Sequence, residues 1–241
     1  MLFIVIPAYN EEKNIARCLQ ALVDQKTSHP FQVILVDNNS TDITVKIAQT
    51  FSKKLNLTII HEKQKGRGPA RKAGFDRALT NAKDKDVIFS TDADAQVLPN
   101  WVETLYLKLT KSNAIAISGM SKLYDATKRE QYMFNKALWM LVRTYRMLFG
   151  HYWLAGFSFA IYADAYKKSG GFHPKLNIQE DIDLSMKVHR VGKILFLKEP
   201  LVYMSGRRFS RGIFHGLMQY LLTFFRHHFL HDETVEIPDP R

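Results

Sequence analysis

Short apolar runs alternate with longer segments of helical periodicity along the first half of the chain. The apolar runs are residues 3–6, 33–36, 57–60, 87–90 and 115–118. The segments of helical pattern between them are residues 11–24, 41–53, 70–82 and 100–111. This regular alternation predicts an α/β fold, in which a mainly parallel sheet is covered by helices on both faces.

Polar residues follow three of these apolar runs directly, forming clusters at residues 7–12, 37–42 and 91–96. Because ligands of open α/β sheets bind beyond the carboxyl ends of the strands, we expect the clusters to converge on one edge of the sheet. The second half is less regular, with an aromatic-rich stretch at 132–166, an acidic cluster at 179–183 and a basic cluster at 206–209.

Size, cysteine content and charge indicate the number of domains, the cellular location and the classes of binding partner. A chain of 241 residues with 46% hydrophobic residues fits one globular domain, residues 1–241. Cys18 is the only cysteine, and the first apolar run stops at Pro7 without a preceding basic region, as a buried strand does and a signal peptide does not. These features predict a cytoplasmic protein. A formal charge of +11 implies attraction to polyanions such as nucleic acid, anionic lipid or diphosphates.

Asp92, Ala93, Asp94 and Gln96 follow the fourth apolar run. Carboxylate and carboxamide oxygens at alternate positions suit a hard divalent cation such as Mg²⁺ or Mn²⁺. The alternative is a turn or a helix N-cap ahead of Pro99. The position after a buried strand favours metal binding.

Two further segments offer groups for a ligand. Asp37 ends a buried strand, where its carboxylate can accept hydrogen bonds from a nucleobase or a ribose hydroxyl, or form an Asx-turn. Residues 66–74 couple glycines to a basic helix start, and their backbone N–H groups together with Arg71 predict a phosphate cradle.

The second half adds carboxylates and guanidinium groups. Glu180 and Asp181 supply either a general base or merely the acidic first turn of a helix. Arg207 and Arg208 can contact a departing diphosphate, but they also fit a solvated basic patch or a contact with anionic lipid.

In this order, the clusters resemble those of glycosyltransferase family 2, over residues 2–215. The matching segments are Pro-Ala-Tyr-Asn-Glu-Glu at 7–12, Val-Asp-Asn-Asn-Ser-Thr-Asp at 36–42, Asp-Ala-Asp at 92–94 and Glu-Asp at 180–181. The resemblance implies a GT-A (Rossmann-like) fold with a nucleotide-sugar-binding half at 1–97, an acceptor and catalytic half at 98–210, and a C-terminal amphipathic helix and loose tail at 211–241. The implied reaction moves a sugar from a nucleoside diphosphate, with a UDP-sugar favoured, to an acceptor hydroxyl with inversion.

The resemblance also assigns roles to residues. The nucleotide sugar is expected at Pro7, Ala8, Tyr9, Glu11, Asp37, Asn39, Gly68, Arg71, Asp92, Ala93 and Arg207. Mn²⁺ or Mg²⁺ is expected on Asp94, with Gln96 and His215 as further candidate ligands, although a single His beside an apolar helix is more often structural. Asp181 is the expected catalytic base beside Glu180, and Arg208 is expected to stabilise charge on the diphosphate.

Two departures from the family pattern narrow the expectation. Lys72 stands where many members have Asn, which bears on the sugar contacts. Phe209 stands where polysaccharide synthases have Trp, and their multiple membrane spans are not found, so processive polymer synthesis is not expected. The Asp-Ala-Asp-x-Gln spelling also resembles the polyprenyl-phosphate sugar transferases, an alternative whose members generally lack the Glu-Asp base.

Residues 212–225 form an uncharged run flanked by Arg211 and Arg226, too short to span a bilayer but suited to a buried helix or an interfacial one. Together with the aromatic stretch and the basic charge, it predicts peripheral contact with the inner face of the cell membrane. A lipid-linked saccharide or glycolipid acceptor and a role in cell-envelope polysaccharide biosynthesis would follow. The alternative is that the aromatic residues wall an acceptor site.

Three competing functions fit the sequence less well. A nucleotidyltransferase would place a glycine-rich basic loop after the first strand, where this chain has Pro-Ala-Tyr-Asn. A nucleic-acid-binding protein would pair the charge with zinc-ligand spacing, an aromatic RNA-recognition signature or a long basic helix, so nucleic acid is not an expected partner. A catalytically silent binding module would have no need of Asp94, Asp181 and Arg208.

Overall fold

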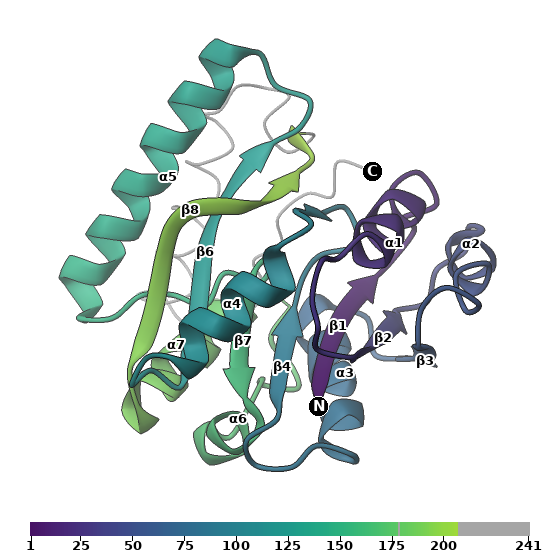
Figure 1. The fold of residues 1–241 in the computed structure, drawn as a ribbon, viewed down its shortest axis with the longest axis horizontal. Helices are drawn as coiled ribbons and strands as arrows, with labels where there is room; N and C mark the ends of the chain where they lie inside the picture. Colours follow the sequence, from purple (N-terminus) through teal and green to yellow (C-terminus); the bar gives the residue numbers. More distant parts are fainter. Residues whose placement is uncertain (178, 207–241) are drawn as a thin grey trace.

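The computed structural model describes residues 1–177 and 179–206, which form an eight-stranded sheet with helices packed against it (Figure 1). The strands are β1 (Leu2–Ala8), β2 (Phe31–Asp37), β3 (Leu57–His61), β4 (Val87–Ser90), β5 (Gln96–Val97), β6 (Ala116–Leu123), β7 (Phe159–Tyr162) and β8 (Ile194–Met204). The helices are α1 (Ile15–Val23), α2 (Thr44–Gln49), α3 (Arg67–Leu79), α4 (Trp101–Thr110), α5 (Lys128–Phe149), α6 (Ala163–Ser169) and α7 (Glu180–Val191).

The strand order is β3-β2-β1-β4-β7-β6-β8-β5. The first four strands are parallel, as the apolar runs predicted. β7 then pairs antiparallel with both β4 and β6, β6 and β8 are parallel, and β5 is an antiparallel edge strand. The sheet is therefore mainly parallel, and β7 separates the fifth predicted strand from the fourth.

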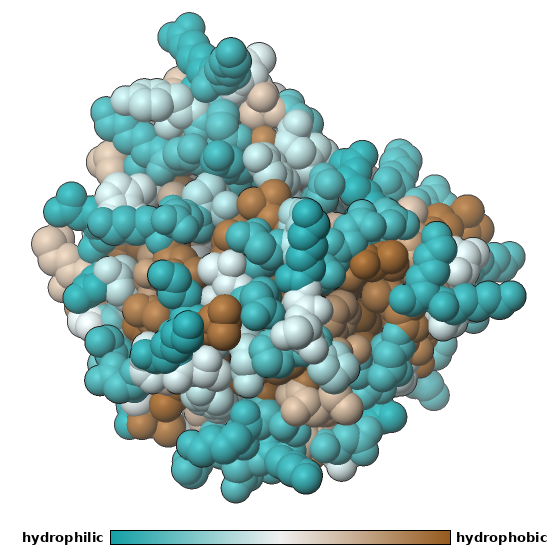
Figure 2. Space-filling model, viewed as in Figure 1, coloured by the Kyte–Doolittle hydropathy of each residue, from teal (hydrophilic) through white to brown (hydrophobic). Residues whose placement is uncertain are grey.

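Apolar side chains on the two faces of the sheet build two large cores, and a smaller one lies under α5. In β1, Leu2, Ile4 and Ile6 join the core under α1 and α4, whereas Phe3 and Val5 join the core under α3, α6 and α7. Alternation along the strand produces this division, because successive side chains point to opposite faces. Helices therefore cover both faces, as predicted, while hydrophilic side chains cover most of the outer surface seen in Figure 2.

Helix α5 was not predicted from the aromatic-rich stretch in which it lies. It begins with a capping box, in which Thr127 accepts a hydrogen bond from the Glu130 N–H and the Glu130 carboxylate accepts one from the Thr127 N–H. It ends at Gly150, whose φ of 76° suits glycine. Its buried face, which includes Phe134 and Leu138, packs on β6.

No helix within the described ranges is both long enough and apolar enough to cross a membrane. The predicted C-terminal helix and tail, residues 211–241, lie outside the described residues.

Candidate functional site

The turn after β4 and the loop after β1 together bring three acidic side chains close to Cys18 on α1. The Cys18 thiol is buried and lies 3.4 Å from the Asp92 carbonyl oxygen. Burial, followed by the negative charges of Asp94, Asp92 and Glu11, raises the pKa of Cys18 far above its ordinary value. Residues expected to bind the donor and the metal are therefore neighbours at the carboxyl edge of the sheet.

This cluster suits a cation that takes part of its coordination from a ligand. Within residues 1–177 and 179–206, no three His, Cys, Asp or Glu side chains are arranged to hold a metal ion by themselves. Mg²⁺ usually binds through one or two carboxylates together with substrate phosphates and water, and Mn²⁺ accepts the same oxygen ligands. Asp94, which is partly buried beside Asp92, fits that mode of binding.

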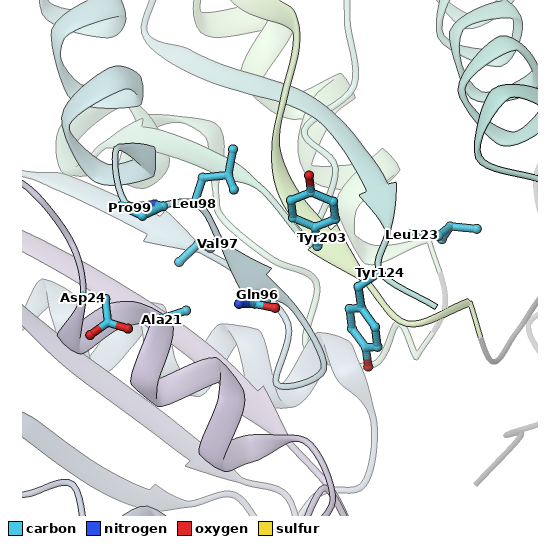
Figure 3. Close-up of a pocket in the computed structure, with 9 residues that line it drawn as sticks. All are labelled: Ala21, Asp24, Gln96, Val97, Leu98, Pro99, Leu123, Tyr124 and Tyr203. Atoms are coloured by element: carbon cyan, nitrogen blue, oxygen red, sulfur yellow. The ribbon is translucent and has the colours of Figure 1, made fainter. Parts of the chain in front are cut away.

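Gln96 lies two residues after Asp94, at the start of β5. It is exposed and lines a cavity of about 340 Å³ between α1 and the β5–β8 edge of the sheet (Figure 3). The cavity is lined by Ala21, Asp24, Gln96, Val97, Leu98, Pro99, Leu123, Tyr124 and Tyr203. The structure thus pairs Gln96 with Tyr203 across β5 and β8, in a cavity that Asp24 also lines, and its role as a metal ligand stays a prediction.

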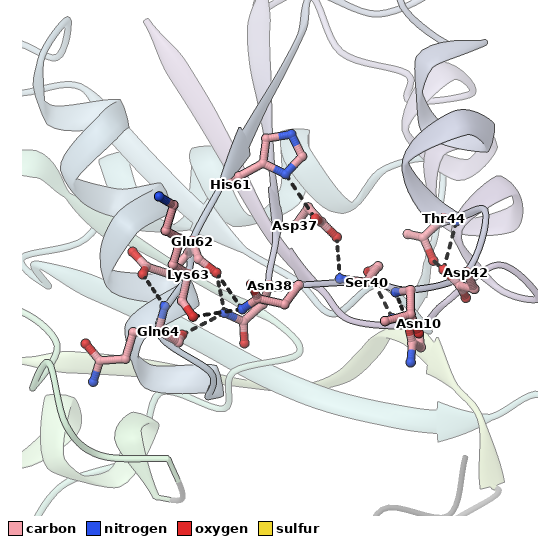
Figure 4. Close-up of polar contacts among 12 residues, drawn as sticks. Asn10, Asp37, Asn38, Ser40, Asp42, Thr44, His61, Glu62, Lys63 and Gln64 are labelled. Carbon is pink, nitrogen blue, oxygen red and sulfur yellow. Dashed lines mark hydrogen bonds and ion pairs between the residues drawn. The ribbon is translucent and has the colours of Figure 1, made fainter.

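The loops that follow β1 and β2 are joined by hydrogen bonds (Figure 4). The Asn10 N–H donates to the Ser40 Oγ at 3.0 Å, and the Thr41 N–H donates back to the Asn10 Oδ1 at 2.8 Å. The Glu11 N–H donates to the Thr44 Oγ1 at 2.8 Å. Two of the predicted polar clusters, residues 7–12 and 37–42, are therefore held together, and we call them the rim.

Asp37 lies on this rim at the end of β2, where it is 5% exposed. One carboxylate oxygen accepts a hydrogen bond from the Ser40 N–H at 3.2 Å, and the other lies 3.0 Å from the His61 Nδ1 (Figure 4). His61 ends β3 and was not among the predicted site residues, although its position at the carboxyl end of a strand is the signal that would have identified it. The carboxylate is thus held in a fixed orientation.

Asn38 and Asn39 tie the rim to the segment before α3. The Asn38 side chain donates to the carbonyl oxygens of Glu62 and Gln64 and accepts a hydrogen bond from the Gly66 N–H. The Asn39 amide group donates to the carbonyl oxygens of Glu62 and Lys63. Asn39, expected to contact the nucleotide, therefore uses its N–H donors to hold this segment in place.

Arg71 lies in the centre of a buried polar network, with its side chain only 3% exposed. Its Nη2 donates to the Asp92 Oδ1 at 2.7 Å and its Nε to the Glu180 Oε1 at 3.1 Å. Its Nη1 donates to the Ser90 Oγ at 2.9 Å and to the Gly156 carbonyl oxygen at 3.3 Å. One guanidinium therefore fixes α3, the end of β4, the loop before β7 and the start of α7.

The charges around Arg71 keep it ionised. Burial alone would lower the pKa of its guanidinium, but the charges of Asp92 and Glu180 raise the pKa above its ordinary value. The sequence suggested an open phosphate cradle at the helix start, whereas the guanidinium is turned into the protein, toward carboxylates that follow it in the chain. Gly156 allows this packing, because a Cβ atom there would lie 2.8 Å from the Arg71 Cζ.

Asp181 follows the Arg71 partner Glu180 in the first turn of α7. Its Oδ2 accepts a hydrogen bond from the Gly156 N–H at 3.3 Å, and its Oδ1 accepts one from the Ile182 N–H at 2.9 Å. Burial and the charge of Glu180 raise the pKa of Asp181 to about 7, against the opposing effects of Arg71 and these hydrogen bonds. A carboxylate with such a pKa accepts a proton readily near neutral pH.

The remaining predicted residues fall into two groups: those that the structure describes and those that lie outside the described residues. Pro7 and Ala8 end β1, where the Ala8 carbonyl accepts a hydrogen bond from the Asn38 N–H, and Tyr9 lies under the Lys65 ammonium. Gly68, on α3, and Ala93 are both buried, and a Cβ atom at Gly68 would collide with the Leu176 carbonyl. Arg207, Arg208 and His215 lie outside the described residues.

Comparison with sequences of known proteins gives one family. The model of Glycosyl transferase family 2 matches residues 3–168. The probable glycosyltransferase YdaM of Bacillus subtilis is 28% identical over 249 residues, covering 92% of this chain and 57% of YdaM. The chondroitin synthase of Pasteurella multocida is 31% identical over 124 residues, covering 52% of this chain and 12% of the synthase. The chain thus spans little more than half of YdaM and a small part of the synthase.

Comparison with solved structures identifies the fold. Residues 1–349 of S. aureus TarS in complex with UDP superpose with a TM-score of 0.66 at 19% identity, covering 94% of this chain and 65% of that one. The mannosyltransferase PcManGT of Pyrobaculum calidifontis, solved with GDP-Man and Mn²⁺, gives a TM-score of 0.64 at 21% identity, covering 99% of this chain and 66% of PcManGT. The predicted GT-A fold is confirmed.

Proposed function

This chain belongs to glycosyl transferase family 2, and from that premise we propose that it moves a sugar from a nucleoside diphosphate to an acceptor hydroxyl. The observation that carries the proposal is the Arg71 network, which holds Asp92 beside Glu180 and Asp181 although they are far apart in sequence. A donor at one side of this network and an acceptor at the other would meet at Asp181.

The nucleotide is proposed to bind along the rim formed by the loops after β1 and β2. Asp37 is held in one orientation by Ser40 and His61, and its carboxylate is the proposed acceptor of a hydrogen bond from an N–H of the base or from a ribose hydroxyl. We favour a UDP-sugar. TarS, whose fold this chain shares, has been solved with UDP and with UDP-GlcNAc, whereas PcManGT has been solved with GDP-Man.

Asp94 is the proposed ligand of Mg²⁺ or Mn²⁺, together with the donor diphosphate. A divalent cation supplies charge neutralisation for the diphosphate when it is bound there. Gln96 and His215 remain the candidates for a second protein ligand. Arg207 and Arg208 remain the proposed contacts to the departing diphosphate.

Asp181 is the proposed catalytic base. The acceptor oxygen attacks the anomeric carbon as the bond from that carbon to the diphosphate oxygen breaks, and the hydroxyl proton passes to the Asp181 carboxylate. A single displacement of this kind inverts the anomeric configuration. Glu180, predicted as a catalytic residue, is proposed instead to position Asp181, because its carboxylate is paired with Arg71 and its side chain is only 6% exposed.

The proposed acceptor is a lipid-linked saccharide or glycolipid presented at the inner face of the cell membrane, as a step in building cell-envelope polysaccharide. The formal charge of +11 supports an anionic surface as the place of reaction.

The test of donor binding is thermal unfolding with UDP, GDP, CDP or dTDP, each with Mn²⁺, Mg²⁺ or EDTA. A ligand that binds only the native state raises its stability, so one nucleotide with metal should raise the Tm and EDTA should abolish the rise. The Asp94→Asn variant should lose the metal-dependent part of this rise in Tm. Asp84→Asn is the matched control, because the Asp84 side chain is 77% exposed and belongs to the turn before β4. No rise with any nucleotide for the folded protein would overturn the proposal.

A further inference from the structure

Helix α5 carries an apolar stripe on the side that faces away from the sheet. Met133, Met140 and Met147 recur every seven residues, and their side chains are 48%, 60% and 78% exposed. Tyr132 and Leu148 extend the stripe, with 67% and 65% of their surface exposed. Since seven residues make nearly two helical turns, these methionines share one face. The helix is therefore apolar on two sides, of which only one is buried.

A row of basic residues runs beside this stripe. Arg129, Lys136 and Arg143 are exposed, and each precedes one of the three methionines by four positions, which places the two side chains next to each other on the helix. None of the ion pairs found within the described residues involves these three side chains. The only acidic residue of α5, Glu130, caps the helix N-terminus. The outer face is thus apolar and cationic.

We propose that this outer face of α5, consisting of residues 129, 132, 133, 136, 140, 143, 147 and 148, docks on an anionic lipid membrane. Flexible methionine side chains bury readily in the boundary between headgroups and acyl chains, and adjacent lysine and arginine residues contact lipid phosphates. The seven-residue spacing of both rows keeps them in one plane along a helix of 22 residues. A flat anionic surface matches this arrangement along its whole length.

Docking through α5 would also help to present a lipid-linked acceptor to the site. This part of the inference rests on the proposed function. Tyr145 lies on the buried side of α5, and soon after the helix ends the chain reaches Gly156, whose N–H donates to Asp181. A helix with its side chains is about 10–12 Å across. A membrane on the outer face of α5 would therefore lie about one helix diameter from the buried side that carries Tyr145, and a lipid-linked acceptor would cross that distance toward Asp181 while its hydrocarbon chain stays in the bilayer.

A fluorescent label on the stripe provides the first test. Cys18 is the only cysteine and is buried, so a Met140→Cys variant of the full chain is labelled selectively with an environment-sensitive dye. Vesicles containing phosphatidylglycerol should shift the emission to the blue, and pure phosphatidylcholine vesicles should not. Ile43→Cys is the matched control, since Ile43 is 49% exposed and lies just before α2. No shift at position 140, or an equal shift at both positions, would overturn the proposal.

Charge reversal provides the second test. A basic residue near an anionic surface contributes about 1 kcal/mol, or about five-fold in the partition coefficient. Lys136→Glu with Arg143→Glu should therefore lower partitioning into the anionic vesicles by at least about 25-fold. Lys108→Glu with Lys111→Glu makes the same change of charge on exposed positions at the end of α4 and should have little effect. Equal partitioning of the two double variants would contradict a contact through α5.

Two further measurements distinguish a membrane contact from other partners of the stripe, and the membrane proposal from the proposed transferase function. Emission that is already blue-shifted without vesicles would mean that a second copy or residues 207–241 cover the stripe, and this result would overturn the proposal. The nucleotide-dependent rise in Tm should be unchanged in both double variants. If vesicles bind but no nucleotide raises the Tm, the proposed transferase function fails and the membrane contact stands.

Discussion

The Nε atom of Arg71 lies 3.1 Å from the Oε1 atom of Glu180, and both side chains are almost fully buried, with 3% and 6% of their surface exposed. This pair links α3 to α7, the helix that carries Asp181. Because Arg71 also donates to Asp92, its single positive charge faces two carboxylates. A buried charge held in this way is costly to leave without its partners.

Arg71→Met should therefore destabilise the fold strongly. Removing one member of a buried ion pair typically costs about 3–5 kcal/mol, because the remaining charges stay buried and uncompensated. Denaturant titration at neutral pH measures the loss in the free energy of unfolding. Lys72→Met is the matched control, since Lys72 forms a partly exposed pair with Asp76 and should cost at most about 1 kcal/mol. Equal losses in the two variants would show that the buried Arg71 network contributes no more to stability than the partly exposed Lys72–Asp76 pair.

The apolar runs identified the first four strands because each is a short run bounded by polar residues. β7 and α5 were missed because apolar and aromatic residues follow one another there without one clear period; α5 has exposed methionines on one side and Phe134 and Leu138 on the other. The rule that ligands bind at the carboxyl ends of strands directed attention to Asp37, Asp92 and Asp94, and the structure places them at or just after the ends of β2 and β4. Sequence could not indicate that Arg71 turns inward, because its partner Glu180 follows it by 109 positions and is brought to it only by the tertiary fold.

The rate of transfer should depend on the protonation of Asp181. Burial and the charge of Glu180 raise the pKa of Asp181 to about 7, so the ionised base is scarce at pH 5 and abundant at pH 8. We expect kcat/KM to rise about tenfold per pH unit below 7 and then to level off, as for a single group in the free enzyme. A profile that is flat between pH 5 and 8 would remove Asp181 from the role of base.

The same residue should make stability depend on pH. An unfolded chain releases the Asp181 proton near pH 4, whereas the folded chain holds it until about pH 7. Since the native state then binds more protons than the unfolded state, the free energy of unfolding should fall as the pH rises from about 4 to 7. Asp181→Asn should weaken that fall, keep nucleotide binding and abolish transfer. Denaturant titrations of both proteins at pH 4.5, 6 and 7.5 provide the comparison.

Gly156→Ala should disturb the network without changing any charge. The added methyl group would lie 2.8 Å from the Arg71 Cζ, so the guanidinium or the loop must move. Overpacking of this kind typically costs about 1–3 kcal/mol. Gly119→Ala is the matched control, because its methyl group would meet Leu197 at an ordinary 3.6 Å. The Tm and the transfer rate should both fall for Gly156→Ala and stay unchanged for Gly119→Ala. An unchanged Tm and rate for Gly156→Ala would mean that the loop accommodates the methyl group.

Asp37→Asn should weaken nucleotide binding while leaving the fold largely intact. Asp37 ends β2 with one oxygen on the Ser40 N–H and the other 3.0 Å from the His61 ring, so an amide of the same shape can occupy its place. A hydrogen bond to a charged acceptor contributes about 1.5–3 kcal/mol, which corresponds to about ten- to hundredfold in the Kd of the preferred nucleoside diphosphate. Calorimetric titration measures that Kd, with Asp84→Asn as the control for loss of one negative charge. If Asp37→Asn binds as tightly as the unaltered protein, the base or ribose is recognised elsewhere on the rim.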